Sequence, residues 1–284
     1  MSTESSFDLH LPPEMAKIAE QVGLKKTKKK KSLSFFLAIT AGVFISIGFA
    51  FYISVTSGPV PATAPVKLLG GICFTLGLIL VVVSGADLFT STVLTIMAKA
   101  SGLISWSSLI INWLIVYIGN LIGALFFVAL IWFSGQIMSS DGQWGLNVLL
   151  TADHKMHHTF FEAVCLGTLA NMMVCLAVWL SYSGHTLLDK IFVMLLPISM
   201  FVCSGFEHSI ANMFLIPLAV IIRYFSPAEF WMHTHHIPDD FPALSIEQFI
   251  TNNLIPVTIG NIIGGGVLVG ITYWVIYLRN TKKS

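Results

Sequence analysis

The sequence has few charged residues. They make up 10% of its 284 positions, whereas a typical soluble domain carries about 25%. Hydrophobic residues account for 55% of the chain, and the formal net charge is only +1. Such a composition cannot supply the charged surface of a water-soluble fold, so we expect a membrane protein. The near-zero net charge also gives no support to nucleic-acid binding.

Motifs for catalysis or metal binding are also missing. The four cysteines stand in apolar runs and form no CxxC pair, so we expect small core residues rather than a disulfide framework or a metal site. The sequence has no nucleophile elbow, no phosphate-binding loop and no paired catalytic carboxylates. Six histidines lie in DHKMHH (153–158) and HTHH (233–236), without the spacing to a carboxylate or thiol that a metal site needs. We therefore predict neither an enzyme nor a cofactor.

Long apolar runs, in contrast, are abundant. A helix that crosses a bilayer needs about 20 predominantly apolar residues. Four uninterrupted runs qualify, at 33–55, 107–133, 159–182 and 253–278. Two more are interrupted: 68–83 is followed by SGADLFTST (84–92), and 187–203 by SGFEHSIANM (204–213) and then 214–222. The prediction is an all-α membrane protein with six transmembrane helices, of which the second and fifth are broken.

The basic residues predict the orientation of these spans. Seven of the fifteen Lys and Arg precede residue 32, where no apolar segment suggests a cleavable signal peptide. With both termini inside, twelve Lys and Arg are cytoplasmic, and only Lys67, Lys155 and Arg223 are external. We predict three parts: a cytoplasmic amphipathic helix and basic segment (1–32), a six-helix domain (33–278) and a cytoplasmic tail (279–284). The helix is expected over 12–24, ending at Gly23.

The two halves of the chain repeat three short patterns in the same order. FFxAxxxG begins at Phe35 and Phe160, SG followed by an acid begins at Ser84 and Ser204, and GNxIG-like segments begin at Gly119 and Gly260. Each half has three spans, an odd number, so the second repeat must enter the membrane from the opposite side. Inverted repeats of this kind place the transported solute near the midplane, where broken helices meet.

The second break contains the most informative residue, His208. An ionisable side chain in mid-membrane is costly and usually faces a cavity or the bundle interior. We expect the repeat-related acids Asp87 and Glu207 to brace the breaks, because a carboxylate in an anion path would repel the solute. New half-helices are expected to begin near Ser91 and Ser209, with their positive ends aimed at the centre.

Further candidates surround the breaks. The hydroxyl of Thr90 is able to cap a half-helix or contact an ion. The amides of Asn171 and Asn261 need partners in mid-span, and either could bond the backbone of a broken helix or His208. Apolar residues near the breaks are candidates for dry constrictions: Phe74, Leu78, Leu88 and Phe201. Lys155 is positioned to draw anions to the outer mouth.

The stretches SGADLFTST and SGFEHSIANM, with the paired GNxxG segments, resemble the formate/nitrite transporter family over essentially the whole chain. The resemblance implies an aquaporin-like protomer, a homopentamer in the bacterial inner membrane and passage of formate and similar monovalent anions. By position it implies a central His208 with Thr90, pore amides at Asn171 and Asn261, and an outer lysine at Lys155. Its constrictions fall on Phe74, Leu78, Leu88, Phe89 and Phe201.

The cargo stays open at this stage. Nitrite, hydrosulfide or acetate would use the same pore residues. A pore for water or glycerol is disfavoured because no NPA motif occurs, and a membrane enzyme or receptor lacks a catalytic constellation. Whether the N-terminal helix gates the pore is a further open question.

Overall fold

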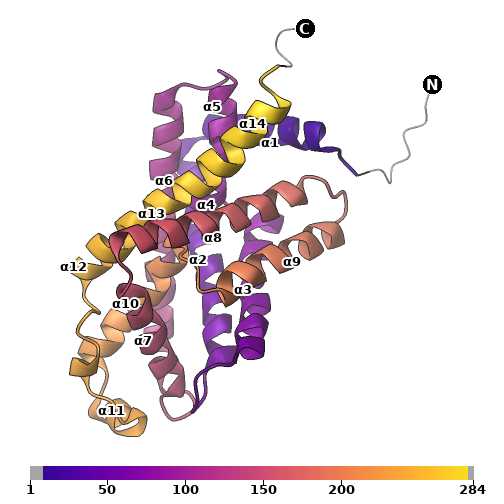
Figure 1. The fold of residues 1–284 in the computed structure, drawn as a ribbon. Helices are drawn as coiled ribbons and strands as arrows, with labels where there is room; N and C mark the ends of the chain where they lie inside the picture. Colours follow the sequence, from indigo (N-terminus) through magenta and orange to yellow (C-terminus); the bar gives the residue numbers. More distant parts are fainter. Residues whose placement is uncertain (1–8, 281–284) are drawn as a thin grey trace.

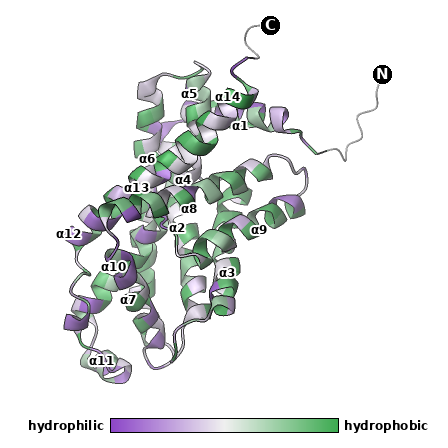
Figure 2. Cartoon of the chain, in the orientation of Figure 1, coloured by the Kyte–Doolittle hydropathy of each residue, from purple (hydrophilic) through white to green (hydrophobic). Residues whose placement is uncertain are grey.

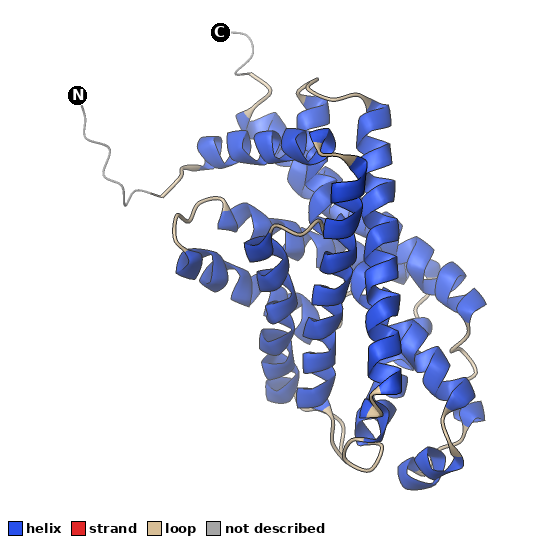
Figure 3. Cartoon of the chain, turned by 180° about the vertical axis from the view of Figure 1, so that it is seen from behind, coloured by secondary structure: helices blue, strands red, loops and turns tan. Residues whose placement is uncertain are grey.

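The computed structural model describes residues 9–280, and within them every regular element is helical (Figures 1 and 3). The α-helices are α1 (Pro12–Lys28), α2 (Lys31–Thr56), α3 (Ala64–Ser84), α4 (Phe89–Thr92), α5 (Ile96–Ala100), α6 (Trp106–Phe133), α7 (Gln143–Met156), α8 (Phe160–Ser181), α9 (Leu187–Cys203), α10 (Ser209–Phe225), α11 (Ala228–Thr234), α12 (Ile246–Gln248), α13 (Ile255–Asn261) and α14 (Thr272–Tyr277). A short 3₁₀ turn joins α4 to α5, and π-helical turns join α12, α13 and α14 into one helix.

Five described helices are long and apolar enough to cross a membrane: α2, α3, α6, α8 and the continuous α12–α14. They are mostly hydrophobic along their length, whereas α1, α12 and the connecting segments contain more hydrophilic residues (Figure 2). The fifth predicted span is broken as expected: α9 and α10 each have 17 residues and are separated at 204–208. The bent pair α10 and α11, at 107°, adds a turn that the sequence prediction did not include.

The internal repeat is built as two equivalent helix pairs. In the first half α6 packs on α2, and in the second α13 packs on α8. A Cβ on Gly123 would collide with the Ile39 carbonyl of α2, and one on Gly264 would collide with the Thr168 carbonyl of α8. The GNxxG segments therefore let the backbones of each pair approach closely, as small residues do in membrane interfaces.

Two glycines end the helices before the breaks. Gly85 follows α3 with φ 75°, and Gly205 follows α9 with φ 70°. This left-handed conformation suits glycine and closes a helix C-terminus. The prediction that the second half-helix begins at Ser209 is confirmed, but the first begins at Phe89, two residues before Ser91.

The N-terminal helix is longer than predicted. α1 continues through the basic residues to Lys28, and Gly23 lies inside it, not at its end. A Cβ at Gly23 would press on Thr95 and Ala98, so this glycine permits close packing on the α4–α5 segment. Met15, Ala16 and Ala19 form the buried face of α1, and they pack with Met97, Trp179 and Leu278.

The described ends of the chain lie at one end of the molecule, beside α1 and α14 (Figures 1 and 3). The segments 134–158 and 226–252, which connect predicted spans, lie toward the opposite end and contain helices α7 and α11. The fold thus places the basic N-terminal segment and the histidine-rich segments far apart.

Candidate functional site

The two broken helices meet at one buried hydrogen bond. Thr90 lies in the first turn of α4, and His208 is the N-cap residue of α10. Their side chains approach to 3.0 Å between Thr90 Oγ1 and His208 Nε2, and both are almost completely buried. The structure therefore brings together two residues that stand 118 positions apart in the sequence.

The geometry around His208 assigns its proton. The backbone N–H of Ala211 donates to Nδ1 at 3.1 Å, so Nδ1 acts as an acceptor and carries no hydrogen. A neutral imidazole then holds its proton on Nε2 and donates it to Thr90 Oγ1. A cationic ring has N–H groups on both nitrogens, so protonation would have to release the Ala211 N–H.

An asparagine braces each break in the same way. The Asn120 Oδ1 accepts from Phe89 N at 2.8 Å, and its Nδ2 donates to the carbonyls of Ala38 and Asp87. The Asn261 Oδ1 accepts from Ser209 N at 2.9 Å, and its Nδ2 donates to the carbonyls of Gly167 and Glu207. These amides satisfy backbone groups that the interrupted helices leave unpaired.

A third amide ties the two breaks together. Asn171, on α8, donates to the Thr90 carbonyl at 3.0 Å and to the Asn261 carbonyl at 2.6 Å. The Cys175 thiol contacts the same Thr90 carbonyl at 3.3 Å. The Nδ2 groups of Asn171 and Asn261 are thus occupied by backbone oxygens, and the direct substrate contact expected of both residues stays a prediction.

Asp87 is held by the N-terminal segment. Lys29 Nζ lies 2.8 Å and Ser34 Oγ 3.0 Å from Asp87 Oδ2, while Lys26 Nζ lies 3.4 Å from Oδ1. Lys26 also donates to Thr92 Oγ1 at 3.1 Å. Burial lowers the pKa of Lys26, and the Asp87 charge acts in the opposite direction. These contacts link the first break directly to α1.

Glu207 is held by an equivalent cluster on the other side. Lys155 Nζ and Asn212 Nδ2 each lie 2.6 Å from its carboxylate oxygens, and Asn253 Nδ2 lies at 3.2 Å. His158 Nε2 approaches to 3.8 Å. Burial lowers the pKa of His158, although the Glu207 carboxylate opposes this effect. Both acids therefore point into built polar clusters and not toward the Thr90–His208 contact.

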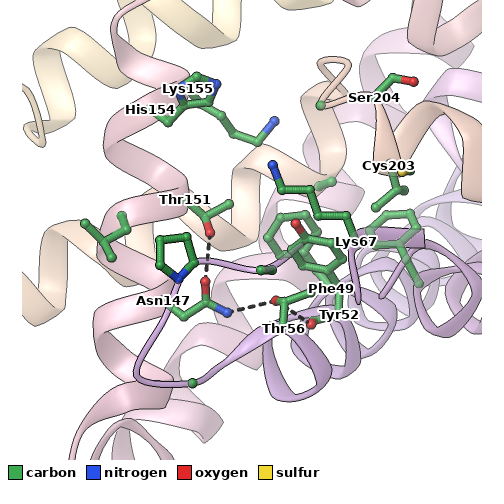
Figure 4. Close-up of a pocket in the computed structure, with 18 of the residues that line it drawn as sticks. Phe49, Tyr52, Thr56, Lys67, Asn147, Thr151, His154, Lys155, Cys203 and Ser204 are labelled. Atoms are coloured by element: carbon green, nitrogen blue, oxygen red, sulfur yellow. Dashed lines mark hydrogen bonds between the residues drawn. The ribbon is translucent and has the colours of Figure 1, made fainter. Parts of the chain in front are cut away.

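A cavity of about 570 Å³ leads to His208 from the end of the molecule opposite α1. We call it the vestibule; its walls come from the α2–α3 connection, α7 and the second break. Its inner end is lined by Phe74, Phe201 and His208. The Phe201 ring stacks on His208 at 5.9 Å and meets Phe74 edge-on at 5.6 Å between ring centroids. Figure 4 shows the wider part of the vestibule, with Asn147, Thr151 and Lys155 on one wall.

The remaining predicted constriction residues lie outside the vestibule lining. Leu78 and Leu88 are buried in the core, and Phe89 packs edge-on against Trp113 and Tyr117. Lys155 does line the vestibule, but its ammonium is paired with Glu207. The expected attraction of anions by Lys155 stays a prediction. Because Glu207 balances the charge of the Lys155 ammonium, less of that charge acts on an anion than the sequence suggested.

The sequence interpretation missed several residues of the polar clusters. Asn212 and Asn253 brace Glu207, and Lys26, Lys29 and Ser34 brace Asp87. The signal for Asn212 was present, since it is an amide within the apolar α10, whereas the lysines belong to a basic run that is also explained by the positive-inside rule.

Comparison with known proteins gives a consistent result. The family model described as formate/nitrite transporter matches residues 13–275. The chain is 64% identical to the formate channel FocA of Escherichia coli (strain K12) over 98% of both chains, and 49% identical to the formate channel FocA of Haemophilus influenzae over 92% of both. A solved structure described as a pentameric formate channel with formate bound is 52% identical, with a TM-score of 0.83, and the match covers 88% of this chain and 98% of that one.

Proposed function

Because the chain belongs to the formate/nitrite transporter family, we propose that it is a passive, bidirectional and pH-dependent channel for formate and related small monovalent anions. Together with the apolar helices, family membership makes it a multi-pass membrane protein. The observation that carries the proposal is the buried Thr90–His208 pair, which lies where the vestibule ends against aromatic rings. Relatives that are named formate channels support formate as the cargo.

The site offers hydrogen-bond donors to an anion. The His208 Nε2–H lies at the inner end of the vestibule and at the N-terminus of α10, where the helix dipole favours negative charge. When Nε2–H donates to Thr90, the threonine hydroxyl hydrogen is free to donate to a second acceptor. A carboxylate arriving from the vestibule would therefore accept first from the Thr90 hydroxyl, and it would gain His208 as a second donor when Nε2–H exchanges its bond to Thr90 for one to the anion.

Two modes of passage follow from the protonation of His208. With the neutral ring, the anion is stabilised by hydrogen bonds alone. At low pH, an imidazolium that has released the Ala211 N–H is able to pass its Nε2 proton to formate, which gives neutral formic acid. The neutral acid crosses the apolar surroundings of Phe74, Leu78, Leu88, Phe89 and Phe201 more easily than the ion.

We also propose the assembly and the orientation. The similarity to a pentameric channel favours a homopentamer with one pore per protomer. The excess of Lys and Arg at the end with α1 favours cytoplasmic termini, and bacterial relatives favour the inner membrane. The proposed parts are the cytoplasmic segment 1–32, the channel domain 33–278 and the tail 279–284, of which residues 1–8 and 281–284 lie outside the described residues.

The test is anion flux through the purified protein in liposomes. Formate, nitrite, acetate and hydrosulfide are compared with and without an imposed pH gradient. We expect formate flux that rises with the gradient, and His208→Asn or His208→Phe should abolish that pH dependence. Unchanged pH-dependent flux in either variant refutes the role of His208. Nitrite or hydrosulfide flux well above formate flux would replace the proposed cargo with the alternative one.

A further inference from the structure

The vestibule is lined by charges of one sign. Among the described residues that form its wall there are two lysines, Lys67 and Lys155, and three histidines, His154, His208 and His236, but no aspartate or glutamate. Figure 4 shows the Lys67 and Lys155 side chains directed into the cavity from opposite walls. A concave surface with one sign of charge raises the local concentration of ions of the opposite sign.

Three of these basic residues, Lys155, His236 and His154, have an acidic neighbour, and His208 is held as the neutral ring by the Ala211 N–H. The Lys155 ammonium lies 2.6 Å from Glu207 Oε1, an ion pair that is almost fully buried. The His236 Nδ1 lies 2.9 Å from Asp240, and hydrogen bonds from the Ile237 backbone and from His236 hold the pKa of Asp240 below its usual value. His154 packs against the ring of His158 and stands next to Asp153 in the chain. Their charges are therefore partly or wholly balanced.

Lys67 is different. It lies in the first two turns of α3, its side chain is exposed to the vestibule, and within residues 9–280 no carboxylate lies within ion-pair distance of it. Other lining residues, among them 58–62, Asn147 and Thr151, are uncharged. Lys67 is thus the lysine of the described vestibule lining that has no ion-pair partner.

We propose that Lys67, rather than Lys155, is the residue that collects anions in the vestibule and sets the apparent affinity of the channel from that side. This inference rests on the proposed anion-channel function. Lys67 acts on the approach of the anion and not on its passage past His208. Its removal should therefore raise KM and leave the maximal flux nearly unchanged, because the barrier at the aromatic end of the vestibule is untouched.

The size of the effect follows from the Coulomb interaction in water. A unit charge about 8 Å from the anion changes its local concentration by about two- to threefold at low salt. We expect Lys67→Gln to raise KM about threefold, and Lys67→Glu, a change of two charges, to raise it about tenfold. Lys67→Arg should keep the KM of the unchanged protein. Because the Debye length falls to about 3 Å at 1 M salt, these differences should largely vanish there.

The experiment measures the concentration dependence of formate influx into proteoliposomes at low and high ionic strength. Lys190→Gln is the matched control, since it removes the same charge from the first turn of α9, away from the vestibule lining. If Lys67→Gln and Lys190→Gln have the same KM at low salt, Lys67 is not the collecting residue. If the unaltered protein carries no formate at all, the proposed function fails instead, and the two failures are thereby distinguished.

A sided chemical test removes the ambiguity of mixed orientation in liposomes. Lys67→Cys is made together with Cys203→Ala, because Cys203 also lines the vestibule. A membrane-impermeant cationic thiosulfonate added outside should restore the low KM, and an anionic one should raise it further. Equal effects of the two reagents would show that occupancy of the site matters and its charge does not, and would overturn the proposal.

Discussion

At the residue scale, the contact between Thr90 and His208 combines two tasks. His208 caps α10 by accepting the Ala211 N–H at Nδ1, and this same bond fixes the Nε2–H toward Thr90. The Nδ1 of the ring stabilises the helix, whereas the Nε2–H is able to exchange its hydrogen-bond partner. Such a side chain is suited to a site that binds anions transiently. Leu88, which holds the equivalent position in the first break, makes no side-chain cap.

The first prediction concerns the Thr90 hydroxyl. Thr90→Val keeps the shape of the side chain but leaves the buried His208 Nε2–H without its acceptor, which costs about 1–3 kcal/mol. We expect formate flux to fall at least about tenfold, because one of the two donors to the anion is lost. Thr90→Ser, which keeps the hydroxyl, is the control and should retain most of the flux. Equal flux in the two variants would rule out a role for the hydroxyl.

At the element scale, the local sequence determines where the helices before the two breaks end. Gly85 and Gly205, each followed by an acid two residues later, mark the helix ends because few other residues adopt positive φ, and the sequence predicted both. The extent of α1 depends instead on distant contacts. Lys26 and Lys29 pair with Asp87, about sixty residues away, and Gly23 packs on Thr95. No periodicity within 12–24 contains that information.

The second prediction tests the link between α1 and the first break. Lys29→Gln replaces a charged contact at 2.8 Å from Asp87 with a neutral one, and Lys26 remains as the second partner. We expect faster amide hydrogen exchange in α1 and in the turn around Asp87, since the ion pair joins both segments. Lys28→Gln, an exposed change on the same helix, is the control. Identical exchange in both variants would mean that apolar packing alone holds α1.

The third prediction concerns the pH dependence of the segment that joins α7 and α8. Burial lowers the pKa of His158 below its usual value of 6.5, so the folded protein favours the neutral ring. The stabilisation is present above that usual value and is lost as the pH falls, because the unfolded chain then binds the proton more readily. His158→Gln should reduce the loss of thermal stability between pH 7 and pH 5. The exposed neighbour His157→Gln should show the full loss.

At the scale of the whole molecule, the two halves of the inverted repeat have similar structures but different side chains at their breaks. Both halves use a GNxxG helix packed on a partner helix, and both place an asparagine over the break. The sequence predicted this repeat and the family from short motifs, and the family is confirmed. It left open whether Asn261 bonds the backbone of a broken helix or His208, because only the fold brings Gly167, Glu207 and Ser209 around one amide.

The repeat therefore predicts that equivalent substitutions of Asn120 and Asn261 have equal effects on stability and unequal effects on anion flux. Asn120→Ala and Asn261→Ala each leave one N–H and two carbonyls without their partner, so both should destabilise the protein by about 3 kcal/mol or more. Thermal unfolding in detergent checks this.

Asn261→Asp keeps the acceptor for Ser209 N–H but loses both donors, and Asn120→Asp does the same at Phe89. If bracing is the main role of Asn261, the two Asp variants should lose stability to the same degree. Asn261→Asp should nevertheless reduce anion flux more than Asn120→Asp, because Asn261 braces the break that contains His208. A stable but inactive Asn261→Ala would instead make Asn261 a direct substrate contact.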